Sequence, residues 1–373
     1  MSFLKMRLDQ VCLIRRGSTI TKNNVKAGNI PVVAGGKTST ISHNEANRDA
    51  NTITVSASGA SAGYVNFWQV PIFASDCSTV EVINELADIN YVYYFLKFKQ
   101  DYLYSLQAGA AQPHVYAKDI AKIEIPLPPL EQQRRIASIL DQAGELRQKR
   151  QQAIEKLDQL LQAEFITKFH QKNYPELNVS NLLENEKSMR TGPFGSQLLH
   201  SEFVDEGIHV LGIDNAVKNS FNWAKPRFIT EEKYKDLKRY TVKPKDVIIT
   251  IMGTCGKCAV VPDDIPTAIN TKHLCCITLD QNKCNPEFLH SYFLLHPTAR
   301  NYLESRAKGA IMSGLNMGII KELPVELPPI EMQNEFSILK QKIILQRSLM
   351  EKKLLKINDL FSSLQNQAFS GTL

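Results

Sequence analysis

Two stretches of the chain carry apolar residues at the spacing of a long amphipathic helix. In the first, the apolar positions after Pro129 recur every three or four residues, with one interruption at Arg150. In the second, an apolar residue occupies every seventh position from Phe336 to Leu364. Such spacing lines one face of a helix and, over several heptads, favours a coiled coil. We therefore predict long helices over residues 128–172 and 328–373.

The two apolar faces share one register, since Ile136 and Phe336 occupy equivalent heptad positions 200 residues apart. Further apolar residues make each face wider than the pairing of two helices would bury. This extra width predicts that a partner protein covers the helices. The residues that we expect at the partner contact are Ile136, Leu140, Ile154, Leu161, Ile344, Leu354 and Phe361.

The segment at the start of each helix is also repeated. Residues 127–133 (LPPLEQQ) return as 327–333 (LPPIEMQ), with five of the seven positions identical. Adjacent prolines favour the end of a strand and the start of a helix, because proline lacks the amide hydrogen and disfavours helix in the residue before it. The agreement extends upstream, where Tyr102 matches Tyr302. A period this long predicts the duplication of one globular domain together with its helix.

Ahead of each helix the chain has the composition of an α+β domain, and we place these two domains at residues 1–127 and 173–327. Strand-like runs alternate with turns rich in Gly, Ser and Asn. The predicted strands are 51–56, 64–67 and 79–83 in the first domain and 246–252 and 274–279 in the second. The predicted helices are 89–104 and 286–305.

The composition indicates the number of domains, the kind of partner and the cellular compartment that we expect. The chain has 373 residues, enough for two domains with cores of their own, and a formal net charge of +6. This charge is compatible with a nucleic-acid partner but does not establish one. The seven cysteines are an odd number and follow no secretory segment, so we expect a reduced, cytoplasmic setting. No apolar run reaches the length of a membrane span, and we expect a soluble protein.

Two segments match catalytic signatures but are better explained as structure. Residues 59–63 (GASAG) fit the nucleophile elbow of hydrolases, but a strand-like run follows instead of a helix, so we predict a tight turn between strands. Residues 285–288 (NPEF) approach a signature of amino-methyltransferases without its second proline, and Asn285 with Pro286 predicts a helix start. No glycine-rich strand-turn-helix motif suits a nucleotide-like cofactor. We therefore expect no cofactor in this chain and no catalysis by it alone.

Metal and nuclease sites are disfavoured for similar reasons. Cys255 and Cys258 form one C-x-x-C pair, but no second pair follows at zinc-site spacing. The remaining cysteines of the second domain suit buried strand positions. The charges of residues 231–240 alternate like an exposed helix face, which is not the pattern of a nuclease carboxylate-lysine set. We expect no metal site.

Several short motifs occur in an order that is typical of one family. They are residues 59–64, 71–77 (PIFASDC) and 112–114 (QPH) in the first half, and 192–196 (GPFGS), 252–254 (MGT), 268–270 (AIN) and 368–373 (AFSGTL) in the second. Together with the duplicated plan, these motifs resemble those of the DNA-specificity subunits of bacterial type I restriction-modification systems. The resemblance covers essentially the whole chain.

The resemblance implies both a fold and a function. In this family each globular domain is a target-recognition domain for one half of a split, asymmetric DNA sequence, and the two long helices pack as an antiparallel coiled coil that sets the gap. A separation near one turn of B-DNA, about 34 Å, is within the reach of such helices. The resemblance further implies two modification subunits that dock on the helices and methylate adenine with S-adenosylmethionine, and restriction subunits that join them. This chain would then be a non-catalytic subunit.

Side chains that suit DNA contacts occur in predicted loops of both domains. Lys and Arg suit phosphates, whereas Asn, Gln and His suit base edges. In the first domain we expect contacts from Lys37, Ser39, His43, Asn44, Arg48, Ser58, Tyr64, Gln112, His114 and Tyr116. In the second domain we expect them from Arg190, Ser196, Gln197, Asn215, Lys218, Asn270, Lys272, His273, Ser313 and Asn316. A solvated loop side chain or a local turn cap is the alternative explanation for each.

The two domains differ just before the proline pairs. The Gln-Pro-His pattern at 112–114 is lost in the second domain, where Ser313 and Asn316 are the polar counterparts. We therefore expect the two domains to contact different half-sites with different loops.

Two other classes of protein remain open. A coiled-coil scaffold or assembly protein without DNA specificity would keep the heptads but would need no polar recognition loops. An autonomous enzyme would methylate or cleave DNA by itself, which the missing cofactor and carboxylate motifs disfavour.

Overall fold

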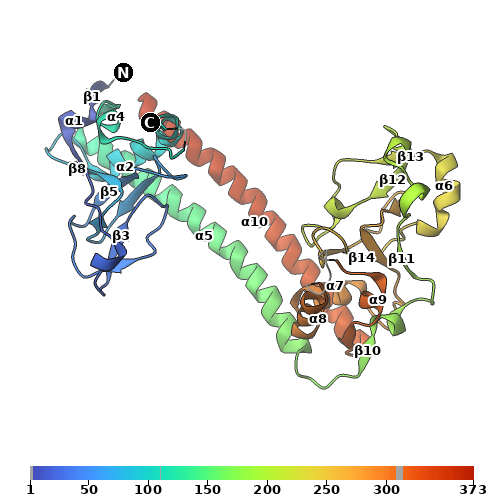
Figure 1. Cartoon of the computed structure of the whole chain (residues 1–373). Coiled ribbons are helices and arrows are strands. Elements are labelled where there is room, and N and C mark those ends of the chain that lie inside the picture. The colour runs from blue at the N-terminus through green and yellow to red at the C-terminus, as the bar shows by residue number, and fades with distance from the viewer. Residues whose placement is uncertain (1–2, 110, 308–313) are drawn as a thin grey trace. The chain divides into compact units, whose positions relative to one another are not determined.

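The computed structural model describes residues 3–109, 111–307 and 314–373 of the chain (Figure 1). Contacts divide the chain into a first unit, Met1–Gln152 with Met350–Leu373, and a second unit, Ala153–Leu349. Each unit contains one globular part and a section of both long helices, α5 (Leu130–Phe169) and α10 (Ile330–Ser370). The division thus falls inside the helices and not at the proline pairs, where we placed the domain boundaries.

Each unit is built around a four-stranded antiparallel sheet with an equivalent strand order. In the first unit the order is β2 (Cys12–Arg16), β8 (Cys77–Val82), β5 (Thr52–Ser56) and β6 (Val65–Trp68). In the second unit it is β11 (Met189–Thr191), β17 (Leu274–Ile277), β14 (Val247–Thr250) and β15 (Cys258–Val260). The central strands β5 and β14 are buried along their whole length, which explains their β-branched composition.

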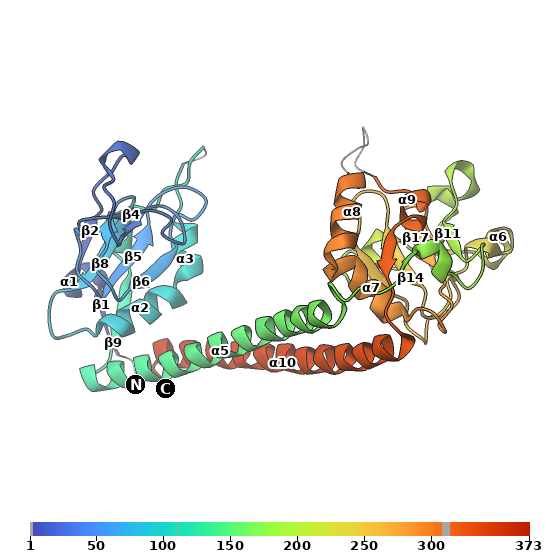
Figure 2. The same cartoon turned by 90° about the horizontal axis from the view of Figure 1, so that it is seen from below.

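Two helices follow the four-stranded sheet in each unit. They are α2 (Ile89–Phe98) and α3 (Gln100–Ser105) in the first unit, and α7 (Pro286–Leu295) and α8 (Pro297–Ala307) in the second. Within the first unit, α2 lies between the sheet and the start of α5 (Figure 2). Tyr94 of α2 donates a hydrogen bond from its hydroxyl to Asp141 of α5 at 2.6 Å. The sheet, the helix pair and the long helix therefore share one core in this unit.

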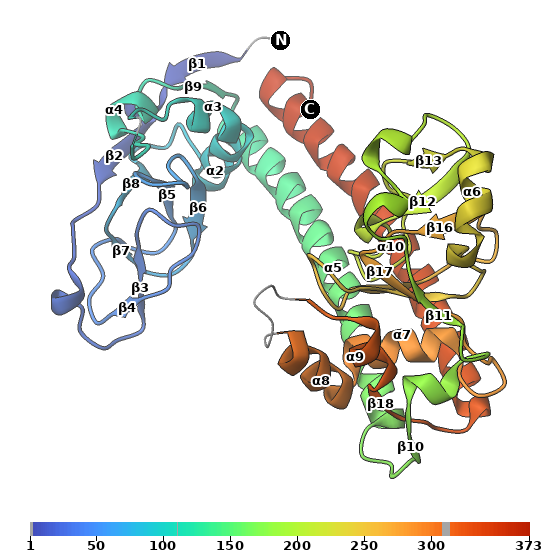
Figure 3. The same ribbon diagram turned by 45° about the vertical axis from the view of Figure 1, so that its right-hand side comes forward.

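A second, three-stranded sheet is also duplicated. Its order is β4 (Ser42–His43), β3 (Ile30–Val33) and β7 (Phe73–Ala74) in the first unit, and β13 (Phe228–Ile229), β12 (Ile208–Leu211) and β16 (Ala268–Asn270) in the second. In both units the central strand pairs antiparallel with one neighbour and parallel with the other. Helix α6 (Glu231–Leu237) lies beside this sheet in the second unit (Figure 3), and Leu237 packs against Val210, Ile229 and Ile269.

A two-stranded antiparallel sheet joins the beginning of each globular part to its end. The strands are β1 (Leu4–Arg7) with β9 (Glu124–Leu127), and β10 (Glu176–Asn178) with β18 (Pro324–Glu326). The short helices are α1 (Leu8–Val11), α4 (Ala117–Ile120) and α9 (Met317–Lys321). Single 3-10 turns occur at Lys22–Asn24, Val179–Leu182, Gly195–Gln197, His200–Glu202, Ile213–Asn215 and Lys238–Tyr240. None of the helices in the described ranges is long and apolar enough to cross a membrane.

The predicted long helices and strands are confirmed, and both shorter helix predictions need correction. The helix predicted over 89–104 is two helices that meet at Lys99, whose ψ of 14° interrupts the first. The helix predicted over 286–305 breaks at His296, which is extended because Pro297 follows it. Periodicity continues across both breaks, so the apolar pattern did not reveal them.

In the first unit the start of α5 packs against the end of α10. Gln132 donates to the carbonyl oxygen of Leu373 at 3.3 Å, and Arg147 donates from Nε to Oδ1 of Asn358 at 2.8 Å. Residue numbers rise along α5 as they fall along α10, so these sections are antiparallel. Phe369 of α10 completes the core by stacking on Phe98 of α2, with ring centroids 5.1 Å apart.

In the second unit the end of α5 packs against the start of α10 in the same manner. Arg347 donates to Oδ1 of Asp158 at 3.1 Å. Phe336 contacts the rings of Phe165 and Phe169 edge-on, with centroids 5.3 and 5.4 Å apart. Arg347 and Asp158 are the repeats of the Arg147 and Asn358 positions in the first unit. The antiparallel direction is thus seen in each unit, and the coiled-coil geometry stays a prediction.

Only part of the predicted partner contact lies on the surface. Three of the seven side chains are buried by this chain itself, namely Ile136, Leu140 and Ile154. This corrects our expectation for these three, because globular elements and the other helix cover the same apolar face. The half-buried ones are Leu161, Leu354 and Phe361. Ile344 is exposed, and so are other residues of α10 outside the heptad positions, among them Leu345, Leu355 and Leu360.

A buried glutamine joins the start of α5 to the first globular part. Gln133 donates from Nε2 to the carbonyl oxygens of Leu86 at 2.8 Å and Pro128 at 2.9 Å. Its Oε1 accepts from the amide of Asp88, the N-cap of α2, at 2.9 Å. The side chain is fully buried, so these bonds have no water to replace them.

Gln333 makes the equivalent three bonds in the second unit. Its Nε2 donates to the carbonyl oxygens of Lys283 at 3.1 Å and Pro328 at 2.8 Å. Its Oε1 accepts from the amide of Asn285, the N-cap of α7, at 2.8 Å. Gln133, the last residue of the segment 127–133, therefore connects the start of α5 to the start of α2. Gln333, the last residue of the segment 327–333, connects the start of α10 to the start of α7 in the same way.

The two units differ at one buried helix position. Leu140 is completely buried in the first unit, and its repeat, Lys340, is only 3% exposed in the second. The Lys340 ammonium pairs with Glu287 at 2.6 Å and lies 2.8 Å from Nδ1 of His290. Nε2 of His290 lies 3.0 Å from the carbonyl oxygen of Asn219. These partners fit a neutral imidazole that donates from Nε2 and accepts at Nδ1.

We expect the second unit to lose stability in acid because of His290. Burial, together with the Lys340 ammonium, lowers the pKa of His290 to about 3. Between this pKa and the unfolded value of about 6.5, the unfolded state binds more protons. The stabilisation from His290 is therefore complete above pH 6.5 and declines as the pH falls toward 3. Urea denaturation followed by Trp223 fluorescence, with Trp68 replaced by Phe, should show a weaker pH dependence for His290→Gln. An unchanged dependence would contradict this assignment.

Gln133→Ala should destabilise the first unit by about 2 to 4 kcal/mol, because it leaves the Asp88 amide and two carbonyl groups buried without partners. Urea denaturation followed by Trp68 fluorescence, with Trp223 replaced by Phe, measures the change. Gln142→Ala is the matched control, since the exposed Gln142 bonds to Ser138 of its own helix and to no other residue in the described part of the chain. Its effect should stay within about 0.5 kcal/mol. Equal effects of the two substitutions would contradict the role of Gln133.

Candidate nucleic-acid interface

Three segments that are distant in sequence meet at one place in the first unit, which we call the first junction. They are residues 35–37 after β3, residues 56–64 at the end of β5 and in the turn to β6, and residues 112–116 before α4. Ser56 donates from its hydroxyl to the carbonyl oxygen of Gly36 at 3.2 Å. The amide of Gly59 donates to the carbonyl oxygen of Pro113 at 3.0 Å. These bonds, one from a side-chain hydroxyl and one between backbone groups, hold the three segments together.

The equivalent segments meet in the second unit, at what we call the second junction. They are residues 213–219 after β12, the turn 252–257 between β14 and β15, and residues 314–316 before α9. The amide of Cys258 donates to Oδ1 of Asn219 at 3.4 Å, and that of Leu315 to the carbonyl oxygen of Ile251 at 2.8 Å. The duplication thus includes a loop cluster at the same place in both folds.

The turns at the two junctions require glycine. Gly59 and Gly63 have φ values of +78° and +89°, and Gly253 and Gly256 have values of +73° and +79°. These angles lie in the left-handed region that side chains disfavour. The segment 59–63 is therefore the tight turn that we predicted between two strands, and no helix follows it.

Six of the ten residues predicted in the first domain lie at the first junction. They are Lys37, Ser58, Tyr64, Gln112, His114 and Tyr116. Lys37, Gln112 and Tyr116 are exposed. The rings of His114 and Tyr116 stack with centroids 6.1 Å apart, and Nζ of Lys118 lies 5.5 Å from the Tyr116 centroid. Lys118 was not among our predicted residues, although the sequence places this basic residue only two positions after the predicted contact Tyr116.

The other four residues lie away from the first junction, and two of them have structural roles. His43 is buried and accepts at Nδ1 from the amide of Lys26 at 3.0 Å. The Arg48 side chain is 9% exposed and pairs with Glu81 at 3.3 Å. This corrects our expectation for His43 and Arg48, whose polar atoms have internal partners. Ser39 donates to two backbone carbonyl oxygens of its own turn, and Asn44 is exposed.

In the second unit, three of the predicted residues lie at or beside the second junction. Asn215 is buried and closes its loop by accepting from the Gly212 amide at 2.9 Å. Asn316 is exposed and caps α9 by accepting from the Ile319 amide at 2.9 Å. Lys218 is exposed. The contact expected from Asn215 is corrected to a structural role, and Ser313 lies outside the described residues.

Two more predictions in the second domain fall on side chains that are largely or fully buried. Arg190 is 12% exposed and pairs with the fully buried Asp246 at 2.6 Å. Asn270 is fully buried and donates to the carbonyl oxygen of Leu274 at 3.0 Å. A polar residue beside a glycine or at the end of a strand can contact DNA or can bond to other groups inside the core. The sequence does not distinguish these two roles. Our expectation of DNA contacts is therefore corrected for both.

The remaining predicted residues of the second domain are accessible to different degrees. Ser196 and Gln197 are exposed, although Gln197 also accepts from the Tyr240 hydroxyl at 2.8 Å. Lys272 and His273 are half-buried. Burial, then Lys272 and Arg227, lowers the pKa of His273. These neighbours give the segment a positive field that suits an anionic ligand.

Metal ligands and cysteine thiols are two kinds of group that could take part in catalysis. Among residues 3–109, 111–307 and 314–373, no three His, Cys, Asp or Glu side chains are grouped in a way that suits a metal ion. Burial raises the pKa of the Cys258 and Cys275 thiols to about 12, so they are protonated at neutral pH. The arrangement is suited to binding.

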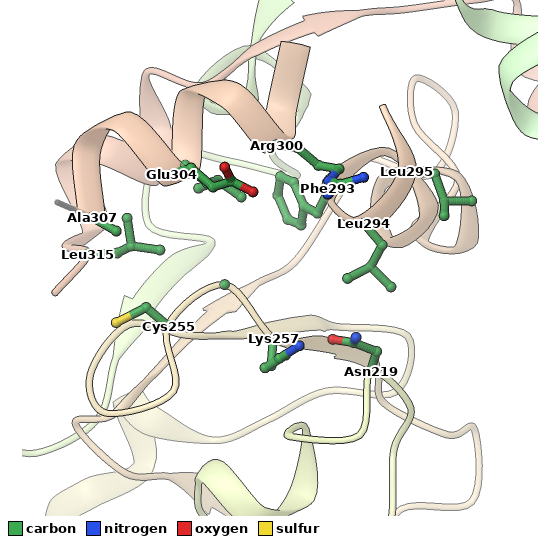
Figure 4. A pocket seen from close by; sticks show the side chains of 12 residues that line it. Asn219, Cys255, Lys257, Phe293, Leu294, Leu295, Arg300, Glu304, Ala307 and Leu315 are labelled. Carbon is green, nitrogen blue, oxygen red and sulfur yellow. The ribbon is translucent and has the colours of Figure 1, made fainter. Parts of the chain in front are cut away.

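A pocket of about 440 Å³ adjoins the second junction (Figure 4). Arg300 and Glu304 of α8 line one side, and Lys257 and Asn219 line the opposite side. In the first unit, the residue equivalent to Arg300 is Gln100. Its amide group instead binds the junction turn, accepting from the amide of residue 65 at 3.1 Å and donating to the carbonyl of residue 63 at 2.7 Å. The two junctions therefore differ in how their turns are held.

Comparisons with known proteins agree with the duplicated plan. A family model described as "Type I restriction modification DNA specificity domain" matches residues 3–156 and 205–359. The specificity subunit of the type I restriction enzyme MjaVIII from Methanocaldococcus jannaschii is 25% identical over 297 residues, which are 76% of this chain and 70% of that protein. The specificity subunit of the type I restriction enzyme EcoBI from Escherichia coli is 24% identical over 307 residues, which are 73% of this chain and 64% of that protein.

Two solved structures share the fold. The S subunit of a type I restriction-modification system from M. genitalium matches with a TM-score of 0.66 and 17% identity, covering 99% of this chain and 96% of that one. A chain from a study of complex assembly and conformational transition of the type I R-M system matches with a TM-score of 0.60 and 16% identity. It covers 100% of this chain and 98% of that one.

Proposed function

This chain belongs to the type I restriction modification DNA specificity family, and we propose that it is the subunit that selects the DNA target of such a system. Each globular part recognises one half of a bipartite, asymmetric duplex sequence. The chain itself is non-catalytic. Methylation of adenine, with S-adenosylmethionine as the donor, belongs to two modification subunits that dock on α5 and α10, and cleavage belongs to restriction subunits.

The observation that supports this proposal most strongly is the pair of junctions. Both units bring the same three segments together, yet the side chains that they present differ. The first junction presents Gln112, His114 and Tyr116, whereas the second presents Asn316 and Lys218. Two half-sites of different sequence need different side chains at equivalent positions, because each base pair presents its own pattern of donors and acceptors.

The long helices suit the role of a spacer. Helix α5 has 40 residues, which correspond to about 60 Å at a rise of about 1.5 Å per residue. We propose that their length fixes the number of bases between the half-sites, as two recognition elements on one face of B-DNA require a defined separation. Exposed apolar residues such as Leu345 and Leu355 offer surface for modification subunits.

Co-expression of this chain with the modification subunit encoded beside it should yield methylated adenines in a split motif with a fixed gap. Single-molecule sequencing of the host genome measures this directly. The purified chain alone should neither methylate nor cleave DNA. If the complex forms but no such motif appears, the chain is a scaffold without DNA specificity.

Two substitutions should separate phosphate contacts from base contacts. Lys272→Ala should lower affinity for all sequences and reduce the slope of log affinity against log salt by about 0.9, because one phosphate contact is lost. Gln112→Ala should instead relax one position of the motif, at a cost of about 1 to 3 kcal/mol in discrimination. Salt titration and methylation mapping are the measurements. If neither variant differs from the wild type, both assignments are wrong.

A further inference from the structure

Two lysines of the first unit lie against the same aromatic ring. Nζ of Lys97, near the end of α2, is 4.5 Å from the ring centroid of Tyr64. Nζ of Lys37, in the loop after β3, is 5.3 Å from the same centroid. Tyr64 belongs to the turn of the first junction. Residues far apart in sequence thus bring two ammonium groups to the edge of this junction.

The pair lacks a compensating negative charge. Among the described residues, no carboxylate forms an ion pair with either lysine, and Lys97 donates only to the carbonyl oxygen of Val65 at 3.2 Å. Lys97 is half-buried, and burial, followed by the charge of Lys37, lowers its pKa. Each ammonium is stabilised by the electron-rich face of the ring, but their mutual repulsion remains.

The surrounding contacts fix this arrangement. Asn66 of β6 donates to the backbone carbonyl oxygen of Lys37 at 2.8 Å, which holds the loop beside the turn. Helix α2 is anchored at its start by Asp88, which bonds to the buried Gln133, and in its middle by Tyr94. These contacts hold the backbone of both lysines on the same side of Tyr64. Uncompensated like charges on a rigid support favour the binding of an anion.

We propose that Lys37 and Lys97, positioned by Tyr64, bind one backbone phosphate of the DNA duplex. This inference rests on the proposed function and adds Lys97 as a DNA contact. Lysine suits the role because its ammonium acts as a compact point charge toward phosphate oxygens. Counted from the N-caps Asp88 and Asn285, the position equivalent to Lys97 in the second unit is Leu294, so this phosphate site belongs to the first unit only.

The test is the salt dependence of duplex binding by the complex of this chain with its modification subunit, using the mapped target. Lys97→Gln should reduce the slope of log affinity against log salt by about 0.9, so the wild type should lose about 3.5-fold more affinity than the variant between about 50 and 200 mM salt. Lys97→Arg should keep the wild-type slope. Lys99→Gln is the matched control, since Lys99 is on the same helix end and lies over Phe98 instead.

A double substitution shows whether one phosphate is shared. If Lys37 and Lys97 hold the same group, the variant with Gln at both positions should have the slope of either single variant. A duplex series with one neutral methylphosphonate at a time should contain one position that weakens the wild type but not Lys97→Gln. These results would support the proposal.

The possible failures are distinguishable. If the wild-type complex binds the duplex and Lys97→Gln has the same slope as Lys99→Gln, this inference is overturned and the proposed function stands. If every methylphosphonate weakens the wild type and Lys97→Gln alike, the inference is likewise overturned. If the wild-type complex binds no duplex, the proposed function is wrong and the phosphate site falls with it.

Discussion

A buried side-chain amide must satisfy all of its hydrogen bonds, and this constraint connects each globular part to its long helix. Gln133 and Gln333 bond to the loop and the N-cap that begin the helices α2 and α7, so the direction of each long helix is tied to the globular core. The junction segments are connected to that core through their own backbone hydrogen bonds. The position of every recognition loop in a unit is therefore linked to the start of a helix.

The sequence predicts those features that follow from periodic patterns. Heptad spacing locates α5 and α10, and strand-like runs between glycine turns locate β5, β6 and β14. The repeat predicts that the second unit copies the first, which the equivalent sheet orders confirm. The breaks at Lys99 and His296 were missed because the apolar spacing continues across them, even though Pro297 was visible.

The candidate site is less predictable, because exposure depends on tertiary contacts. Arg48 and Arg190 have the chemistry of phosphate contacts, but Glu81 and Asp246, both distant in sequence, hold them inside the fold. Asn215 likewise closes a loop. The pairing of Lys37 with Lys97 depends on α2 lying beside β6, which no local pattern indicates. Loop polarity thus predicts candidate segments, but it does not show which side chains within them have internal partners.

The core of the first unit combines the beginning of the chain with its last residues, which are synthesised much later. One of its last components is Phe369, whose ring packs against Phe95 and Phe98 of α2, and Leu373 also packs against this core. At about 5 to 20 residues per second, the ribosome needs roughly 10 to 40 s to make the chain between residue 152 and this phenylalanine. During that time the apolar surface of α2 stays exposed, because the end of α10 that covers it has not yet been synthesised. A nascent chain that is released before the end of α10 would keep that surface uncovered and be open to chaperones and proteases, so only chains that include the end of α10 complete the first unit.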